Sequence, residues 1–274
     1  MPTPFLSIVS ITFQNAAGLA LTLESIARQT FTDFEVIVVD GGSKDGTRAV
    51  VESNDALVTR FISEPDRGIS DAFNKGTAVA RGTLVNYLNA GDRYLDASVL
   101  ATVHAAHRAR PFAWAYGLSK RTDADGNVSP SHAQQRLPYS FDALAAGRLL
   151  VSHQAAFFDT AAVREIGAYD EALVQAMDYD LFLRMAQRYE PAVIDEPLVL
   201  YDTEGVSARR NLEGLLAKHA VRARVLGLST IDARIDLGRT YARYAIGRVR
   251  RLGKRTLVQN AAGRALLRRL GLLE

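Results

Sequence analysis

Near the start of the chain, two short apolar runs flank a segment with helical periodicity, and this order leaves few folds open. Leu6–Thr12 and Phe34–Asp40 are rich in β-branched residues and each ends in polar residues, while apolar side chains recur at helical spacing over Ala17–Arg28. Strand, helix and strand in this order predict two parallel strands joined by a right-handed crossover. The start of the chain therefore predicts an α/β fold.

Two further strands are predicted downstream, and polar residues follow each of them. Val58–Ser63 leads into the loop EPDRG, and Leu84–Leu88, which leads into the turn NAGD, is almost wholly apolar, as expected of a parallel strand covered on both faces. In open α/β sheets, ligands bind in the crevice outside the carboxyl ends of the strands. The sequence therefore predicts that one edge of the sheet presents Thr12, Gln14, Asp40, Asp66, Arg67 and Asp92.

Six segments in a fixed order carry a family resemblance. They are SIVSITFQN, VIVVDGGSKDGT, EPDRGISDAFNKGTAVARG, LNAGD, SHQAAFF and MDYDLFLR, and together they span roughly Leu6–Ser207. This pattern resembles inverting family 2 glycosyltransferases of the GT-A fold, especially bacterial enzymes that build exopolysaccharide or O-antigen repeat units. The resemblance implies a Rossmann-like, mostly parallel sheet with flanking helices, followed here by a basic helical extension.

By this resemblance, the first half of the chain binds the nucleotide. Asp40 looks like the carboxylate that accepts a hydrogen bond from a ring N–H of the nucleobase, while Thr12 and Gln14 line the same pocket. Arg67, next to Asp66, lies beside the nucleotide, where its guanidinium neutralises phosphate charge. Uracil, thymine and guanine all present such an N–H group, so UDP is only slightly favoured.

Asp92 looks like the last position of the family's DxD-type metal motif. Mg²⁺ or Mn²⁺, held by carboxylates and phosphate oxygens, stabilises a departing diphosphate. The usual turn has two or three acidic residues, whereas this one has a single carboxylate. We therefore expect metal binding to be weak without nucleotide.

The second half is expected to hold the base and to meet the acceptor. Asp178 matches the family's catalytic aspartate, which takes a proton from the acceptor hydroxyl as that oxygen attacks the anomeric carbon. Asp180 is its rival, although two residues along a helix turn its side chain about 200° away. By resemblance, His153 and Arg209 lie on the acceptor or phosphate side, Arg209 in a loop that closes over phosphate.

Each of these residues also has a structural alternative. Asp40 could shape a turn, and Asp92 or Asp178 could cap a helix. Arg67 could form only an ion pair with the adjacent Asp66 or Glu64. A histidine beside apolar residues, such as His153, is often a satisfied core group.

Composition limits the classes of protein that fit. A chain of 274 residues with 48% hydrophobic content can bury one large core, alone or with a helical appendage. It has no cysteine, so neither a disulfide nor a thiolate metal site is possible. We expect neither a signal peptide nor a membrane span. We expect a catalytic domain at 1–210, divided into a nucleotide-sugar half at 1–118 and an acceptor half at 119–210, and a tail at 211–274.

Charge is distributed unevenly along the chain. Residues 218–274 hold 14 Lys or Arg and three acidic residues, whereas the rest holds 19 and 27. Helices are predicted over Leu212–Val225, Ile235–Val249 and near Ala262–Leu270, with glycines 227, 253, 263 and 271 as breaks. Basic and apolar residues interleaved over 218–270 suit an amphipathic surface on anionic lipid. We therefore expect a cytoplasmic enzyme, peripheral on the inner face of the cytoplasmic membrane.

A solvated helical face or a dimer contact is the alternative for this tail, and no nucleic-acid partner is expected because no recognised motif is present. The resemblance implies an inverting hexosyltransferase that moves a sugar from a nucleoside-diphosphate sugar to a saccharide or polyprenyl-linked acceptor in cell-surface polysaccharide synthesis. A non-catalytic nucleotide-sugar-binding subunit and a nucleotidyltransferase of the same fold are the alternatives. An oxidoreductase is nearly excluded, because the turn after the first strand lacks G-x-G-x-x-G.

Overall fold

The computed structural model describes residues 3–122, 127–131, 133–202 and 212–258, with side chains up to residue 248. The chain divides into two compact units, which we call unit 1 (residues 1–208) and unit 2 (residues 209–274). The predicted boundary at 210/211 falls within residues 203–211, outside the described ranges, and stays a prediction. The predicted division at 118/119 falls inside a continuous strand of unit 1.

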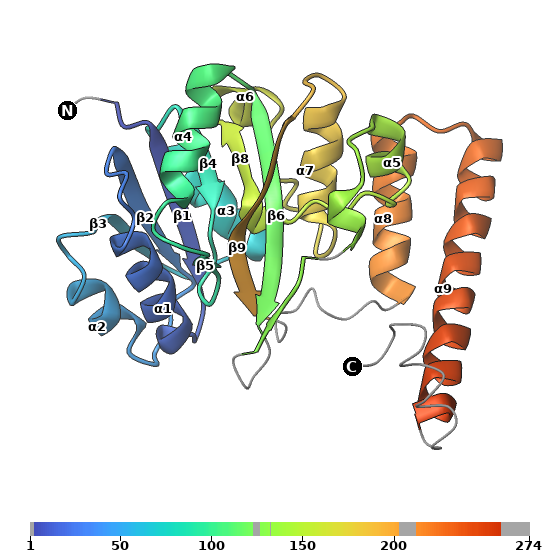
Figure 1. Ribbon diagram of the computed structural model, residues 1–274, viewed down its shortest axis with the longest axis horizontal. Helices are drawn as coiled ribbons and strands as arrows, with labels where there is room; N and C mark the ends of the chain where they lie inside the picture. Colours follow the sequence, from blue (N-terminus) through green and yellow to red (C-terminus); the bar gives the residue numbers. More distant parts are fainter. Residues whose placement is uncertain (1–2, 123–126, 132, 203–211, 259–274) are drawn as a thin grey trace. The chain divides into compact units, whose positions relative to one another are not determined.

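Unit 1 is built on one twisted sheet, whose described strands follow the order β3-β2-β1-β4-β8-β6-β9-β5, with β7 paired to β6 (Figure 1). The first four in this order are parallel to one another, and β6 is parallel to β9. The antiparallel strand β8 joins these two groups, so β6 and β9 run in the same direction as β1. The strands are β1 Leu6–Thr12, β2 Phe34–Asp40, β3 Val58–Ser63, β4 Leu84–Tyr87, β5 Arg93–Tyr94, β6 Trp114–Thr122, β7 Val128–Ser129, β8 Ala156–Asp159 and β9 Ala192–Asp202.

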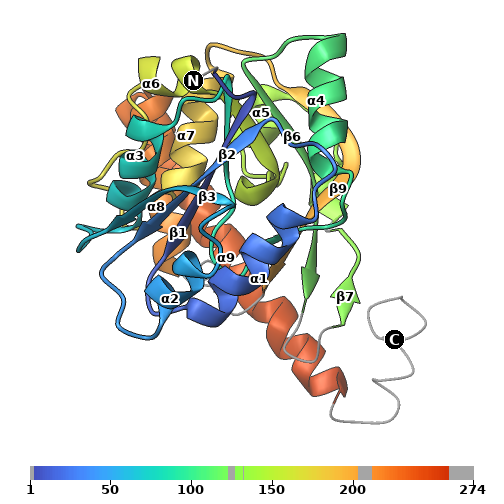
Figure 2. The ribbon, with the colours of Figure 1, turned by 90° about the vertical axis from the view of Figure 1, so that its left-hand side faces the viewer.

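Helices cover both faces of this sheet, with α1 and α4 on one side and α3 and α7 on the other (Figure 2). The short helix α2 packs beside α1. The helices of unit 1 are α1 Ala16–Ala27, α2 Thr47–Glu52, α3 Ile69–Val79, α4 Val99–Ala109, α5 Phe141–Ala145, α6 Thr160–Glu165 and α7 Met177–Ala186, with 3₁₀ turns η1 Ala133–Arg136 and η2 His153–Ala155. The predicted α/β sheet with flanking helices is confirmed.

The alternation of side chains along β1 explains why helices are needed on both faces. Leu6 and Ile8 belong to the core that α1 and α4 cover. Val9 points to the other face, where Gly76 of α3 approaches it so closely that an added Cβ would lie 2.3 Å from the Val9 Cγ1 atom. Helix α3 can therefore rest directly on β1 because position 76 has no side chain. The apolar runs in the sequence predicted strands of this kind, buried on both faces.

The described residues of unit 2 form two helices, α8 Leu212–Val225 and α9 Thr230–Val258. The predicted break at Gly227 is confirmed, since this residue has a left-handed φ of 59° between the helices. The predicted break at Gly253 is wrong, because α9 continues through it, and α9 also extends beyond the predicted 235–249 at both ends. The predicted helix near 262–270 lies outside the described residues. Within the described ranges, the helices lack the length and apolar character that crossing a membrane requires.

Candidate active site

The carboxyl ends of the parallel strands lie side by side, as the sequence predicted. Thr12 is in register with Asp40, and Asp40 with Ser63. The turn that follows β4 lies beside the end of β1, where Ala90 N donates a 3.1 Å hydrogen bond to Ile11 O. These ends face the lower side of Figure 1, toward which β6 and β9 also run. One edge of unit 1 therefore collects the polar residues that follow these strands.

Asp40 is buried, and its carboxylate is oriented by neighbouring donors. Both of its oxygens accept the Ser43 N–H at 3.1 Å, and Oδ2 accepts the Ser63 hydroxyl at 2.7 Å. The turn role named as the structural alternative is therefore real, and it also holds the carboxylate at the end of β2. Its recognition of a nucleobase stays a prediction.

Thr12 and Gln14 follow at the end of β1. Thr12 is 6% exposed, and its Oγ1 is buried without a hydrogen-bond partner among the described residues. An unsatisfied buried hydroxyl is costly, so a ligand or a water molecule is its expected partner. Gln14 is exposed and has a φ of 51°, and its N–H donates to Ser43 Oγ at 2.7 Å, which joins the β1 and β2 loops.

Arg67 and Asp66 belong to a network of ion pairs at the start of α3. Arg67 pairs with Asp71 at 2.7 Å and with Glu171 at 2.9 Å, so its partners are not the adjacent Asp66 or Glu64 named as the structural alternative. Hydrogen bonds from Arg67 hold the pKa of the Asp71 carboxyl at about 2. Asp66 pairs with Lys75 at 2.7 Å. The Arg67 side chain is 76% exposed, which leaves it accessible to a phosphate.

Lys75 ties the acidic side chains of this network together. Its ammonium contacts Glu64 at 3.1 Å and Asp71 at 3.2 Å in addition to Asp66. Burial alone would lower the pKa of Lys75, but the hydrogen bonds to Asp66, Glu64 and Asp71 outweigh it and raise the pKa. Lys75 therefore stays charged and fixes the loop that carries Arg67.

Asp92 closes the turn after β4 and is buried. Its N–H donates to Asn89 O at 2.9 Å, and its carbonyl accepts the Thr22 hydroxyl at 2.7 Å. Thr22 also accepts the Gly91 N–H at 3.0 Å, at a glycine whose φ is 103°. The sequence reasoning missed Thr22 as the anchor of this turn. The only feature of the sequence that could have indicated this role is that Thr22 is a polar residue on the buried side of the predicted helix.

The donor atoms at this turn suit a hard cation. Asn89 Oδ1 is buried without a partner among the described residues, and Asn89 belongs to the same turn as Asp92. Mg²⁺ and Mn²⁺ prefer such oxygen ligands. Within the described ranges, however, no three His, Cys, Asp or Glu side chains gather as a protein-made metal site requires. The residues therefore fit a cation that is held mainly through substrate phosphates.

Asp178 lies in the first turn of α7, half-buried, where its Oδ1 accepts the Tyr179 N–H at 2.7 Å. The cap of this helix is Ala176 with a φ of 62°, so Asp178 is not the N-cap of the structural alternative. A carboxylate in the first helical turn is favoured by the helix dipole. Its role as a base stays a prediction.

His153 lies in η2, behind a layer of aromatic rings. It is 8% exposed, and its Nε2 lies 2.6 Å from the Tyr169 hydroxyl. Its ring stacks on Tyr87 with centroids 5.3 Å apart. Burial lowers the pKa of His153 to about 4, although the charge of nearby Asp178 acts in the opposite direction. His153 is therefore neutral near pH 7 and does not supply positive charge to a phosphate.

Asp180, which was predicted on the acceptor or phosphate side, is a buried residue of α7. It is 0% exposed and pairs with Arg184 at 2.7 Å. Arg184 also donates to Ile166 O at 2.7 Å, so the pair ties α7 to the end of α6. Helix geometry explains this burial, because the two positions that separate Asp180 from Asp178 turn its side chain toward the core. The role predicted for Asp180 stays a prediction. Arg209 lies outside the described residues.

The loop that precedes Asp178 is bonded to helix α3 and to the EPDRG loop before it. Asn74 of α3 pairs with both backbone groups of Tyr169, since its Oδ1 accepts the Tyr169 N–H at 2.9 Å and its Nδ2 donates to Tyr169 O at 2.9 Å. Arg67 contacts Glu171 of the same loop. Helix α3 therefore couples the position of the EPDRG loop to that of the segment leading to α7.

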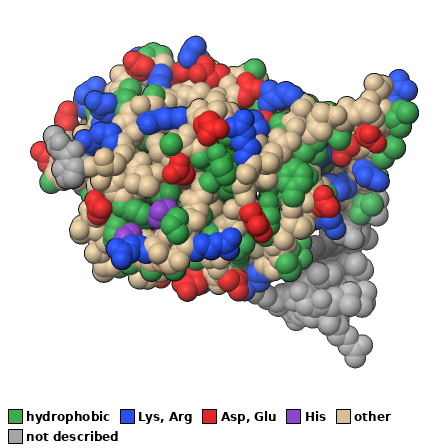
Figure 3. All heavy atoms as spheres, turned by 90° about the horizontal axis from the view of Figure 1, so that it is seen from above, with side chains coloured by type: hydrophobic (Ala, Val, Ile, Leu, Met, Phe, Trp, Pro, Cys, Tyr) green, Lys and Arg blue, Asp and Glu red, His purple; other side chains and the backbone are tan. Residues whose placement is uncertain are grey.

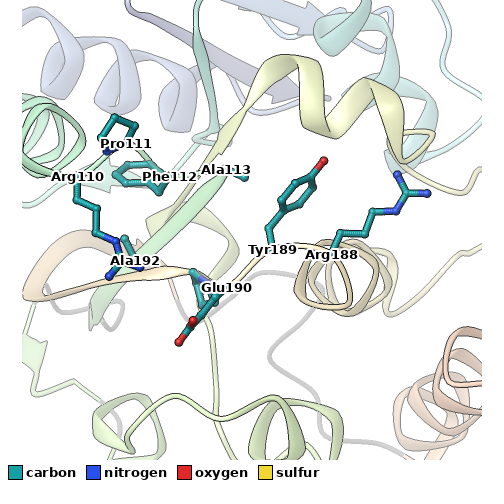
Figure 4. A pocket seen from close by; sticks show the side chains of 9 residues that line it. Arg110, Pro111, Phe112, Ala113, Arg188, Tyr189, Glu190 and Ala192 are labelled. Atoms are coloured by element: carbon teal, nitrogen blue, oxygen red, sulfur yellow. The ribbon is translucent and has the colours of Figure 1, made fainter.

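A pocket of about 310 Å³ lies elsewhere, between the segments that precede β6 and β9 (Figure 4). It is lined by Arg110–Ala113 and Arg188–Ala192. These residues lie at the amino ends of β6 and β9, so the pocket is on the opposite edge from the polar strand ends. That edge mixes acidic and basic side chains and shows no single charged patch (Figure 3). None of the predicted site residues that the structure describes lines this pocket.

Comparison with known sequences gives one consistent result. A family model described as Glycosyl transferase family 2 matches residues 7–158. A protein of Mycobacterium tuberculosis, described as an uncharacterized glycosyltransferase, is 34% identical over 211 residues, which are 76% of this chain and 78% of that protein. A PGL/p-HBAD biosynthesis glycosyltransferase of Mycobacterium bovis is 33% identical over 187 residues, which are 67% of this chain and 70% of that one.

Solved structures share the fold at low sequence identity. S. aureus TarS, in complex with UDP-GlcNAc, has a TM-score of 0.66 and 17% identity, over 84% of this chain and 69% of that chain. The mannosyltransferase PcManGT from Pyrobaculum calidifontis, in complex with GDP-Man and Mn²⁺, has a TM-score of 0.63 and 16% identity, over 92% of this chain and 81% of that one. The fold and the resemblance read from the sequence are both confirmed.

Proposed function

Because this chain belongs to glycosyl transferase family 2, we propose that it is an inverting enzyme that transfers a sugar from a nucleoside-diphosphate sugar to a hydroxyl of a saccharide or lipid-linked acceptor. The chain is a transferase that acts on nucleotide sugars. The observation that carries the proposal is the Thr12 hydroxyl, which is buried beside Asp40 without a partner in the part of the chain that the structure describes. The same sheet edge also presents Arg67 and Asp92. Along one row of strand ends, this arrangement offers side chains that can bind a nucleobase, a diphosphate and a cation.

The proposed reaction is a single displacement at the anomeric carbon. The acceptor oxygen forms a bond to that carbon, while the bond from the carbon to the nucleoside diphosphate breaks and its electron pair leaves with the phosphate. Asp178 accepts the proton that the acceptor hydroxyl loses. Attack from the side opposite the leaving group inverts the anomeric configuration.

The donor side is proposed to bind and orient the leaving group. Asp40 accepts a ring N–H of the nucleobase, and Arg67 donates to the diphosphate. A divalent cation supplies further charge neutralisation at the diphosphate when it is bound, and Asp92 with Asn89 would hold it. PcManGT was solved with Mn²⁺, which supports a divalent cation in this fold.

Isothermal titration with UDP, GDP and dTDP, each with and without Mn²⁺, tests this proposal. We expect one nucleotide to bind, more tightly with Mn²⁺, and Asp92→Ala to remove the effect of the metal. Asp96→Ala is the matched control, because the side chain of that exposed aspartate bonds only to Ser98 among the described residues. No binding of any nucleotide would contradict the proposal, and tight binding without sugar transfer would support the non-catalytic alternative.

We further propose that unit 2 attaches the enzyme to an anionic membrane surface, where a lipid-linked acceptor resides. Ile231, Ile235 and Ile246 are 71%, 48% and 53% exposed. At about 100° per residue they lie on one side of α9. Asp236 and Thr240, which lie on the other side, bond to Arg222 of α8. Arginines flank this apolar side, in the arrangement typical of helices that lie on anionic lipid: Arg234, Arg239, Arg243 and Arg248.

A role in cell-surface synthesis is proposed from the relatives. One is described as a PGL/p-HBAD biosynthesis glycosyltransferase, and a chondroitin synthase of Escherichia coli is 26% identical over 67% of this chain and 27% of that protein. These descriptions support a lipid or saccharide acceptor for this chain. The location of the enzyme on the inner face of the cytoplasmic membrane follows from this proposal.

A further inference from the structure

Two basic side chains lie on one face of the sheet where β5, β9 and β6 run side by side. Arg93 of β5 is in register with Leu200 of β9, and Lys120 of β6 is in register with the same leucine from the other side. Residues in register point to the same face of a sheet, and the two outer strands of such a group lie about 10 Å apart. Both long side chains can therefore reach one anion that lies over Leu200.

Neither of these side chains forms a hydrogen bond or an ion pair within the part of the chain that the structure describes. The Nε atom of Arg93 is buried without a partner, and so is that of Arg121, the residue after Lys120. A buried guanidinium nitrogen without an acceptor is costly, so an anionic ligand is its expected partner. Other partly buried cations of unit 1 are paired with carboxylates: Lys75, Arg81 and Arg184.

The place of Lys120 in the sheet argues against a purely protective role. A basic residue on an edge strand such as β5 can serve to prevent pairing with other chains. β6, however, lies inside the sheet between β8 and β9, so this reason does not account for Lys120. By alternation along β6, Lys120 shares its face with Trp114, whose ring lies 5.8 Å from that of Phe182 in α7. The two cations therefore face the side of the sheet that α7 covers (Figure 2).

This pair of cations is separate from the predicted nucleotide site. The predicted nucleotide-binding residues follow β1, β2 and β3, whereas Arg93 and Lys120 belong to strands at the other end of the sheet. The same pair is nevertheless close in sequence and fold to the predicted reaction centre. Arg93 directly follows Asp92, and the helix on this face carries Asp178 in its first turn.

The charge of the pair suits a phosphate group. A phosphate monoester carries about −1.5 to −2 charges near pH 7, whereas the carboxylate of an acidic sugar carries one. Arginine can donate two parallel N–H groups to phosphate oxygens, and lysine adds a second positive charge. We propose that Arg93 and Lys120 bind a phosphate group of the acceptor, so that the acceptor is a phosphate- or diphosphate-linked saccharide. The inference rests on the proposed function, in which Asp92 and Asp178 serve the same reaction.

Geranyl diphosphate is a suitable probe, because it is a soluble isoprenyl diphosphate that has neither a sugar nor a nucleobase. Isothermal titration should show that it binds to the full chain. Arg93→Gln with Lys120→Gln should weaken this binding by at least about tenfold, because two charge-assisted contacts are lost, while nucleotide binding stays within about twofold. Inorganic pyrophosphate should compete with the probe and geraniol should not bind, which distinguishes recognition of the phosphates from recognition of the lipid chain.

Arg108→Gln with Arg110→Gln is the matched control, because it removes two positive charges from exposed arginines at the end of α4, on the opposite edge of the sheet. It should leave the affinity for the probe unchanged. Arg67→Gln, on the nucleotide side, should weaken nucleotide binding and keep the probe. Thermal unfolding checks that each variant is folded, and Lys120→Gln alone, the milder change, should still weaken binding of the probe.

Absence of probe binding to the wild type, or unchanged affinity in the Arg93 and Lys120 variants, would overturn the inference. An equal loss of probe and nucleotide binding would also overturn it, because both cations would then belong to the donor diphosphate. An equal loss in the control would show that only net charge matters. Failure of the proposed function looks different. In that case no nucleotide would bind, while the probe would still decide whether these two cations hold a phosphate.

Discussion

His153 lies within a layer of aromatic rings, and burial lowers the pKa of its imidazole to about 4 from an ordinary value of 6.5. Below pH 6.5 the unfolded chain binds a proton that the folded chain does not bind. The stability that His153 contributes is therefore complete above pH 6.5 and is lost as the pH falls toward 4. Burial also lowers the pKa of His107, which adds a loss in the same direction.

We predict that replacing His153 by Gln removes part of this pH dependence. Between about pH 7.5 and pH 5, the difference in free energy of unfolding between wild type and His153→Gln should shift by about 1–2 kcal/mol, with the variant gaining relative to wild type on acidification. Urea unfolding at the two pH values measures this shift. His107 is present in both proteins, so its contribution cancels. An unchanged difference would mean that His153 titrates normally.

The two aspartates at the start of α7 should separate turnover from stability. We predict that Asp178→Asn lowers kcat by about 10²- to 10⁴-fold, because the general base is lost, with little change in nucleotide binding. Asp180→Asn should lower the free energy of unfolding by about 1–3 kcal/mol, because Arg184 loses its buried charged partner. Steady-state kinetics and urea unfolding on both variants distinguish the roles. Equal effects on kcat would contradict the assignment.

At the scale of elements, the contact of α3 with β1 depends on a missing side chain. We predict that Gly76→Ala destabilises unit 1 by about 1–3 kcal/mol, because its Cβ would lie 2.3 Å from Val9 Cγ1 and would push the helix off the sheet. This cost exceeds the gain of roughly 1 kcal/mol in helix propensity. Thermal unfolding measures the effect.

Gly238→Ala provides the control for this prediction. Gly238 lies inside α9, and an added Cβ there would meet nothing within 4 Å. Only the higher helix propensity of alanine then affects stability, so this substitution should be neutral or stabilising by about 0.5–1 kcal/mol. Loss of stability in both variants would show that helix packing is not the cause.

The elements that could be predicted are those whose signal is local. β1, β2 and β3 have the bounds that their apolar runs indicated, because polar residues and glycines mark where burial stops. The end of α9 was mispredicted because one glycine lowers the stability of a long helix by only about 1 kcal/mol. The neighbouring helical turns stabilise the helix by more than this. The two-residue strand β5 has no local pattern.

The same distinction applies to the site. Asp40 and Asp92 could be placed at one sheet edge because strand order and direction bring them there. The Thr22 anchor and the pairing of Asn74 with Tyr169 could not be predicted, since each joins a side chain to backbone that is distant in sequence. The burial of Asp180 could have been inferred from the helical pattern of α7, because Asp180 lies on the side of the helix opposite Asp178.

At the scale of the whole molecule, the excess of basic residues in unit 2 leads to a membrane prediction. We expect the protein to sediment with vesicles that contain anionic lipid and not with zwitterionic ones, and to be released by salt. Ile235→Asp with Ile246→Asp should abolish sedimentation, because both exposed apolar side chains are lost. Val128→Asp, at a valine of unit 1 that is 52% exposed, is the control. Sedimentation that survives the double substitution would contradict the proposal.

The strand β5 joins the middle of unit 1 to its last strand, and this pairing matters during protein synthesis. Residues 93 and 94 follow the Asp92 turn directly, yet they pair with Leu200 and Val199 of β9, about a hundred residues later in the chain. A nascent chain that has emerged only to residue 118 contains every predicted nucleotide-binding residue but lacks the strand that fixes one side of this turn. Since domains tend to fold as units on the ribosome, the donor site should become competent only after β9 has left the exit tunnel. An incomplete polypeptide that ends before β9 should then bind no nucleotide sugar.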